Sequence, residues 1–234
     1  MVFVREHLDK FKQLGPTTES WKVDVKNYLT AFFSNKSDSI INIDVKANSI
    51  PSGYLGRSEI FNFIENISDD LLLNTYVILA WGKMRHANLA QLVTSEYIWF
   101  PLVKRIHTNK LDREDSYQEF IFLLSNGMKG MRAPYFTKLI YFLTRNSSKR
   151  GFILDQWTGR SMNLLLGYDL IKLDKGQSGK YVNNFNTVEI YEKYCINLEL
   201  LGEELSLEPE EVELRLFSTG RGKGEWRNYV KLHT

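Results

Sequence analysis

The sequence predicts an all-α or mostly α-helical fold, and two observations lead to this prediction. Apolar residues recur at three- and four-residue spacing through most of the 234-residue chain, which is the period of one face of a helix. Helix-capping residues stand next to these segments, whereas only residues 40–45 suggest a short strand. We expect one domain over residues 1–234, because 43% hydrophobic residues are enough for a single core.

The N-terminal half is expected to form six helices. Ser68, Asp69 and Asp70 are N-cap residues in front of the most apolar of them, which ends at Gly82. Residues 35–56 are polar and irregular. The expected helices cover residues 2–14, 20–34, a segment that begins at Ser58, 71–81, 89–93 and 97–106.

The C-terminal half is expected to form five helices. Residues 112–116 cap the first helix, and Asp155 caps the third. Pro134 suits the start of the second, where a missing N–H costs nothing. Residues 174–186 are a Gly/Asn-rich loop, and the tail from Ser218 is basic. These helices cover residues 117–125, a segment from about 134, 156–166, 188–205 and 209–217.

Charge is segregated along the chain, although the net charge is only +2. Residues 126–154 carry six Lys or Arg and no acid, whereas residues 189–213 carry nine Glu and one Lys. Such segregation suggests a positive face for a polyanion and a negative face turned away from it. Two solvated helix surfaces that differ by chance would give the same pattern.

Several classes of protein are excluded by composition. The single cysteine, Cys195, cannot form an internal disulfide, and no Cys/His cluster suggests a metal site. No apolar run could span a bilayer, and the N-terminus is too charged for a signal peptide. We therefore expect a cytoplasmic protein with no metal, no cofactor and no membrane partner.

The segment GMKGMRAP, residues 127–134, is expected to turn between two helices. Such a turn exposes backbone N–H groups at a helix N-terminus, where a phosphate is favoured. Lys129, Gly130, Arg132 and Ala133 are then the candidate phosphodiester contacts. Taken alone, an ordinary glycine-capped pair of helices explains the turn more simply.

The order of turn, apolar helix, basic loop and Asp155 in ILDQWTGRS resembles the helix–hairpin–helix DNA glycosylases. Over residues 117–166 it is similar to remote bacterial members of the 8-oxoguanine (OGG-like) branch. The resemblance implies an N-terminal extension at 1–56, a core at 57–166 that contains the hairpin 117–146, and helices at 187–234 that close a base pocket. It also implies a monomer acting on double-stranded DNA with one flipped nucleotide, and Asp155 as the catalytic carboxylate.

The segment VELRLFS, residues 212–218, resembles the C-terminal helix of that branch. The resemblance implies that Phe217 stacks on the flipped base and that Glu213, one turn earlier, binds its polar edge. The family has glutamine at the second position, so Glu213 changes the contacts a base can make. Alternatively, Glu213 is a surface glutamate and Phe217 anchors the last helix in the core.

The corner WGKMRHAN, residues 81–88, is similar to the part of the family that fills the gap left by the flipped base. Arg85, His86 and Asn88 are the candidates for this wedge. A solvated corner after a buried helix explains these residues equally well. Trp81 is expected in the core rather than in a base stack.

The family also implies a lysine that forms a Schiff base with the sugar. Pro134 stands where that lysine is expected, and Lys138 follows one turn later on the same face. If Pro134 replaces the lysine, the enzyme is monofunctional, which is the reading the sequence favours. If Lys138 substitutes for it, the enzyme also has AP-lyase activity.

The function implied by the resemblance is a DNA glycosylase that excises a modified base. An oxidised purine or a hypermodified phage-type base would suit it, in DNA repair or in anti-phage defence. One alternative is a non-catalytic DNA-binding module that keeps only the turn. Another is a structural partner protein in which the acidic helix at 188–205 docks on a basic surface.

Overall fold

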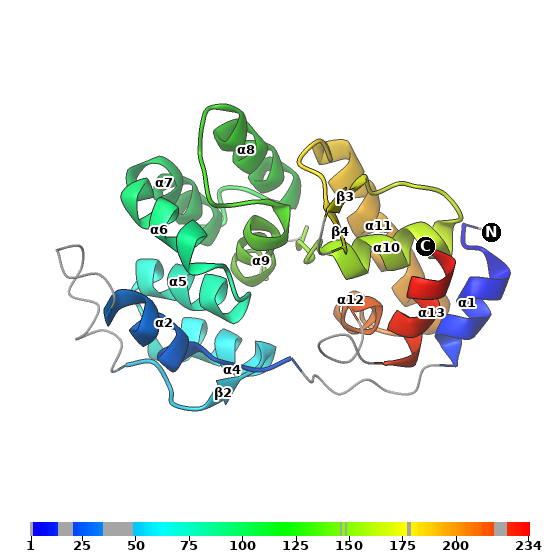
Figure 1. Ribbon diagram of the computed structural model, residues 1–234, viewed down its shortest axis with the longest axis horizontal. Coiled ribbons are helices and arrows are strands. Elements are labelled where there is room, and N and C mark those ends of the chain that lie inside the picture. Colours follow the sequence, from blue (N-terminus) through cyan, green and yellow to red (C-terminus); the bar gives the residue numbers. More distant parts are fainter. Residues whose placement is uncertain are drawn as a thin grey trace.

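The computed structural model describes residues 2–13, 21–34, 49–145, 147, 149–176, 179–217 and 224–234. In this part of the chain the structure has twelve α-helices, one π-helix and two small sheets, each of two antiparallel strands. The prediction of a mostly α-helical fold is therefore confirmed. Figure 1 shows the helices gathered in two lobes, and α8 of one lobe packs on α11 of the other.

The first lobe contains the elements from β1 to α9, and the sheet β1–β2 pairs Val23 with Leu55. Its elements are β1 (Val23–Asp24), α2 (Val25–Ser34), β2 (Tyr54–Leu55), α4 (Arg57–Asn62), the π-helix η1 (Phe63–Ile67), α5 (Leu71–Trp81), α6 (His86–Thr94), α7 (Glu96–His107), α8 (Arg113–Ser125) and α9 (Ala133–Leu143).

The second lobe contains the elements after Asp155 together with the first helix of the chain. Its elements are α1 (Arg5–Lys12), α10 (Gln156–Leu166), β3 (Leu173–Gly176), β4 (Gly179–Val182), α11 (Val188–Leu205), α12 (Pro209–Phe217) and α13 (Glu225–His233). The backbone N–H of Val4 donates to Leu165 O at 2.7 Å, and the rings of Phe11 and Trp226 lie 4.8 Å apart. The expected extension 1–56 is thus divided between the lobes.

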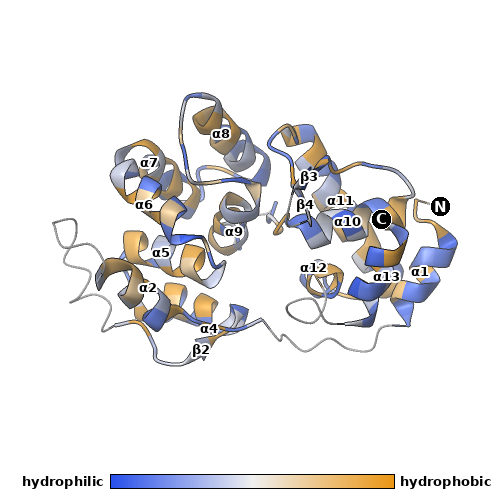
Figure 2. Ribbon diagram, in the orientation of Figure 1, coloured by the Kyte–Doolittle hydropathy of each residue, from blue (hydrophilic) through white to orange (hydrophobic). Residues whose placement is uncertain are grey.

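Helix α5 lies at the centre of the first lobe and packs on α2, α7 and α9. Every residue from Leu73 to Trp81 is buried, as an apolar sequence without a polar face requires. Asp70 caps this helix, because its Oδ1 accepts from the N–H groups of Leu72 and Leu73. Figure 2 shows α5 coloured mainly as hydrophobic, whereas α1 is hydrophilic on its outer side.

Several predicted boundaries are confirmed: α10, α11 and α12 begin and end at the expected residues. Two predictions are wrong. The helix expected over 20–34 begins at Val25, after the strand β1. The segment 174–186 is largely the β3–β4 hairpin, in which Leu173 pairs with Val182. The tail, for which no particular helix was predicted, includes α13. The strand expected at 40–45 and residues 218–223 lie outside the described residues.

None of the helices in the described ranges combines the length and the apolar character that crossing a bilayer requires. The described residues also hold no group of three His, Cys, Asp or Glu side chains able to bind a metal ion. Cys195 is a buried free thiol, and burial raises its pKa to about 12.

Candidate active site

A cavity of about 430 Å³ lies between the two lobes, and both contribute to its wall. From the first lobe come Trp21, Arg57, Trp81, Gly82, Arg85, Pro134, Tyr135 and Lys138. From the second lobe and the segment that leads into it come Ile153, Asp155, Gln156, Trp157, Gly179, Lys180, Tyr181, Val182, Leu214, Phe217 and Arg227. Four of the residues expected in a site from the sequence therefore share one cavity: Arg85, Lys138, Asp155 and Phe217.

Asp155 caps helix α10, and its side chain also lines the cavity. Its Oδ1 caps α10, accepting from Trp157 N at 2.7 Å and from Thr158 N at 3.0 Å. Thr158 completes a capping box by accepting from Asp155 N at 2.9 Å. These bonds fix the side chain, while its second oxygen makes no hydrogen bond with the described residues. A carboxylate held in this way is available to a positively charged group in the cavity.

Lys138 is buried in α9 and lines the same cavity. Its amine donates to the carbonyl oxygen of Pro134, one helical turn earlier. Burial lowers the pKa of the Lys138 amine, although the charges of Asp155 and Glu213 oppose this, and Arg57 lowers it further. A lysine of this kind has a larger neutral, nucleophilic fraction than an exposed one.

Glu213 lies behind the cavity wall and is fully buried, so its interpretation as a surface glutamate is wrong. Arg57 donates to both carboxylate oxygens, at 2.9 and 3.1 Å. Burial raises the pKa of Glu213, and the guanidinium of Arg57 opposes that rise. The carboxylate is engaged by Arg57, and it is Arg57 that reaches the cavity.

Phe217 ends α12 and lines the cavity, partly buried. Trp21 meets its ring edge-on, with 6.0 Å between ring centroids, and the guanidinium carbon of Arg227 lies 5.1 Å from its centroid. The aromatic wall at this end of the cavity therefore comes from both lobes. Trp81 is 2% exposed, which agrees with its expected place in the core, although it also borders the cavity.

The turn from Asn126 to Arg132 joins α8 and α9, which pack on each other. Lys129 and Arg132 are exposed, whereas Ala133 is buried at the start of α9. Gly130 has φ of +87°, and an added Cβ would lie 2.7 Å from the carbonyl oxygen of Asn88. Glycine is thus required there both by the backbone conformation and by close packing on the neighbouring corner.

Arg85 and His86 of that corner are exposed, and Asn88 is half-buried. Arg85 is exposed and borders the cavity. The ring of His86 packs 4.7 Å from Tyr28 and 5.4 Å from Phe32, between ring centroids. Asn88 supports Gly130 through its backbone. Among the three candidates, Arg85 is the residue that the structure brings to the cavity.

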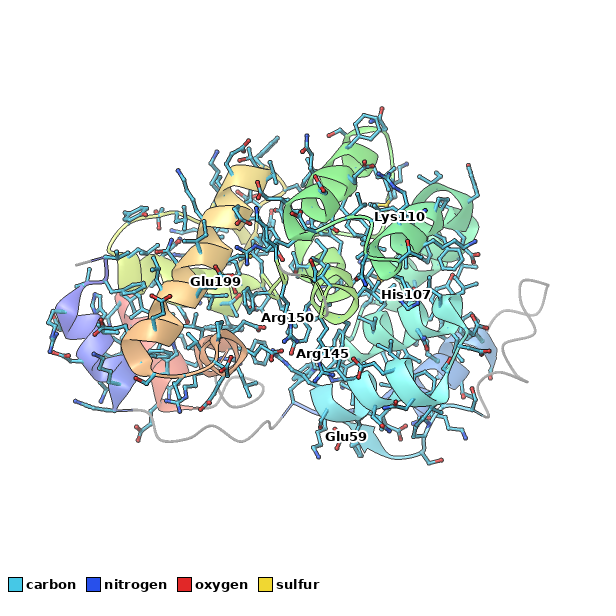
Figure 3. The ribbon with its side chains drawn as sticks, turned by 180° about the vertical axis from the view of Figure 1, so that it is seen from behind. Glu59, His107, Lys110, Arg145, Arg150 and Glu199 are labelled. Carbon is cyan, nitrogen blue, oxygen red and sulfur yellow. The ribbon has the colours of Figure 1, made fainter. Side chains whose placement is uncertain are left out.

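The basic segment does not form one continuous positive face. Arg145 pairs with Glu65, Lys149 with Glu114 and Arg150 with Glu210. Figure 3 shows Arg150 where the two lobes meet, with Glu199 on the second lobe. Lys138 is buried, so only Lys129 and Arg132 of the segment are exposed without an ion pair to the described residues. Both are exposed, as a contact with DNA would require, and their assignment to DNA stays a prediction.

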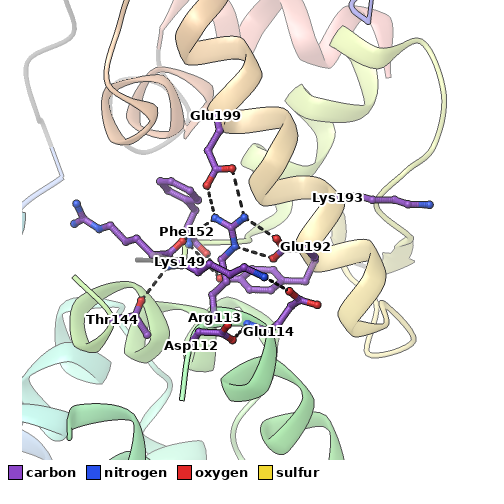
Figure 4. A network of polar contacts seen from close by, with 12 residues as sticks. Asp112, Arg113, Glu114, Thr144, Lys149, Phe152, Glu192, Lys193 and Glu199 are labelled. Atoms are coloured by element: carbon purple, nitrogen blue, oxygen red, sulfur yellow. Dashed lines mark hydrogen bonds and ion pairs between the residues drawn. The ribbon is translucent and has the colours of Figure 1, made fainter. Parts of the chain in front are cut away.

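The acidic segment contributes to the contact between the lobes rather than to a face turned away. Arg113 of α8 is 3% exposed and pairs with Glu192 and Glu199 of α11 (Figure 4). Burial alone would lower the pKa of Arg113, but hydrogen bonds to both glutamates raise it above its usual value. Its guanidinium also donates to Arg150 O at 3.0 Å. The acidic segment also meets the basic one directly, through the pair of Glu210 and Arg150.

Four further residues line the cavity but were not expected there from the sequence. Arg57 stands at the start of a helix, where a basic residue is unremarkable, and its partner Glu213 is 156 residues away. Tyr135 and Trp157 follow Pro134 and Asp155 closely, and that proximity could have identified them. Tyr181 lies in a segment expected to be a loop, so nothing pointed to it.

The fold and the cavity define a two-lobed, mostly helical protein in which one cavity holds a carboxylate and a buried amine. A family model with the description "Putative 8-oxoguanine DNA glycosylase OGG-like protein" matches residues 17–217. The chain therefore belongs to the OGG-like family, whose description points to DNA as the partner. Searches of curated proteins and of solved structures gave no match.

Proposed function

We propose that this protein is a DNA N-glycosylase that takes one modified nucleotide of a duplex into the cavity between the lobes and releases its base. The observation that carries the proposal is the presence of Lys138 and Asp155 in one cavity. The exposed Lys129 and Arg132, on the turn before α9, would hold the phosphodiester backbone outside it. Membership of the OGG-like family supports this assignment.

Asp155 would stabilise the transition state electrostatically. Breaking the bond between C1′ and the base nitrogen develops positive charge on the sugar, and a fixed carboxylate lowers the energy of that charge. The cap of α10 holds Asp155 through one oxygen only. The other oxygen can therefore approach the sugar without loss of the cap.

Lys138 would act as the nucleophile. Its neutral amine forms a bond to C1′ while the base leaves with the bonding electrons and takes up a proton. The nitrogen then loses a proton, the C1′–O4′ bond opens, O4′ becomes a hydroxyl and a Schiff base remains. The lowered pKa of Lys138 and its place in the cavity favour this bifunctional mechanism over the monofunctional one expected from Pro134.

The substrate would be a modified base, either an oxidised purine or a hypermodified base of the phage type. Phe217 offers its ring as one wall for a base plane. Glu213 would act on the base only through Arg57, because both of its oxygens bind that guanidinium. Which base is released would decide between a role in repair and a role in defence against phage.

Base release from a panel of oxidised and hypermodified duplexes tests this function. Asp155→Asn should bind DNA normally and release no base, because asparagine keeps the cap but has no charge. Asp112→Asn is the matched control, since Asp112 caps α8 in the same way through its Oδ1. Binding by the wild-type protein without release from any duplex would instead establish a non-catalytic DNA-binding module.

Borohydride trapping tests the nucleophile. The wild-type protein should give a covalent adduct with a substrate duplex, and Lys138→Ala should give none. Lys129→Ala should still be trapped, because Lys129 is exposed and does not line the cavity. Base release that persists in Lys138→Ala, with no adduct in the wild type, would assign the monofunctional mechanism.

A further inference from the structure

The β3–β4 hairpin places an exposed aromatic ring of the cavity wall under an exposed guanidinium from the turn before α9. Tyr181 of β4 lines the cavity and is 40% exposed. The guanidinium carbon of Arg132, from the turn before α9, lies 6.0 Å from the centroid of this ring. The two residues come from different lobes. Tyr181 shares the cavity wall with Asp155 and Lys138.

The hairpin is held firmly in this position. Val182 is buried, and β4 packs on α10, the helix that Asp155 caps. The backbone N–H of Ile171 donates to Asn163 Oδ1 and its carbonyl accepts from Asn163 Nδ2, both at 2.8 Å. The ring of Tyr181 lies over Gly176 across the strands, where an added Cβ would be 3.0 Å from Tyr181 Cε1. The ring is therefore pre-ordered.

We propose that Arg132 and Tyr181 together bind the nucleotide next to the one that enters the cavity, the guanidinium holding its phosphate and the ring stacking on its base. The phosphate of a nucleotide is bound by a cation, and its base stacks on an aromatic ring. Arg132 supplies the cation and Tyr181 supplies the ring. Removing a nucleotide from the duplex leaves its neighbour without a stacking partner, so an aromatic face at the cavity edge stabilises the opened strand. The proposal rests on the proposed function for the identity of DNA as the partner.

A duplex with a tetrahydrofuran abasic nucleotide tests the proposal without any chemistry. 2-Aminopurine on either side of that nucleotide reports stacking by its fluorescence, and anisotropy reports affinity. Tyr181→Ala should bind about 5- to 150-fold more weakly, the range expected for loss of one base–aromatic stack. It should also change the fluorescence of one of the two 2-aminopurine positions, and Tyr181→Phe should behave as the wild type.

Phe185→Ala is the matched control, because Phe185 is 76% exposed, follows the same hairpin and does not line the cavity. Tyr181→Ala should leave the salt dependence of binding unchanged, whereas Arg132→Ala should reduce its slope by about one phosphate contact. Binding of Tyr181→Ala within twofold of the wild type, or an equal loss in Phe185→Ala, would overturn the proposal. The probe has no base to release, so this experiment tests only the binding of the neighbouring nucleotide. The glycosylase function would fail in a different experiment, if the wild-type protein released no base.

Discussion

The methylene chain of Lys138 lies directly against the backbone of Gly82, where an added Cβ would be 2.8 Å from Lys138 Cδ and 3.1 Å from Cε. Gly82 has φ of −67°, a conformation open to every residue. The lysine, rather than the backbone, therefore requires glycine at this position. The location of the amine in the cavity depends on a residue without a side chain in another part of the lobe.

Gly82→Ala should displace the Lys138 amine and reduce the rate of borohydride trapping, on the order of 100-fold if the amine moves by about 1 Å. Single-turnover trapping measures this rate. The same substitution in the Lys138→Ala background should be nearly neutral for the free energy of unfolding, because the clash is gone. An unchanged trapping rate in Gly82→Ala would show that formation of the adduct does not depend on the present position of the Lys138 amine.

Lys138→Met should stabilise the protein at neutral pH. The folded-state pKa of Lys138 is lowered, so the unfolded chain binds more protons, and wild-type stability rises as pH passes from the folded pKa towards 10.5. The advantage of Lys138→Met should therefore be largest at low pH and shrink as pH approaches 10.5. Chemical denaturation across this range measures it.

Lys149→Met is the control for that experiment, because Lys149 is exposed and Glu114 raises its pKa. This variant should show no gain in stability at neutral pH. The difference in unfolding free energy between Lys138→Met and the wild type should change with pH. A constant difference would contradict the lowered pKa of Lys138.

Arg57→Met should lower the free energy of unfolding by about 3–5 kcal/mol, because it leaves the buried Glu213 without its partner. Arg57→Met with Glu213→Leu should recover much of this loss, since two apolar side chains need no compensation. Denaturant unfolding of the single and double variants measures the effect. A double variant no more stable than Arg57→Met would mean that the pair is not energetically coupled.

Lys129→Ala should reduce the slope of log K against log salt concentration by about 0.9, the value for one phosphate contact on duplex DNA. Its effect should be similar for duplexes of different sequence, because a phosphate contact reads no base. Lys149→Ala should leave the slope unchanged, since Lys149 already pairs with Glu114 at 2.8 Å. Equal slopes for wild type and Lys129→Ala would remove this residue from the DNA-binding surface.

Local signals explain which parts of the fold could be predicted. Asp70, Asp112 and Asp155 are N-cap residues that act within three residues of themselves, so the sequence alone identifies the starts of α5, α8 and α10. The strands of the β3–β4 hairpin have four residues each and bury little beyond Val182. They show no alternating pattern, so their pairing was not visible.

The residues of the site also divide into those that the sequence suggested and those that it did not. Lys138 and Asp155 are 17 residues apart in the stretch that resembles the helix–hairpin–helix glycosylases, and that resemblance suggested both. The pair of Arg57 and Glu213 spans the two lobes, and no local pattern contains both residues. The segregation of charge was visible in the sequence, but the ion-pair partners of the glutamates were not. A Glu that pairs with a distant Arg cannot be told from a solvated Glu by sequence alone.

The ion pairs of Arg113 matter for variants of this protein, because they join the two lobes. Lys138 belongs to one lobe and Asp155 begins the other, and Arg113 is one of the residues that join the lobes, through Glu192 and Glu199. Glu192 does not line the cavity. We expect a substitution at Glu192 to weaken this contact between the lobes and so to change the separation of amine and carboxylate.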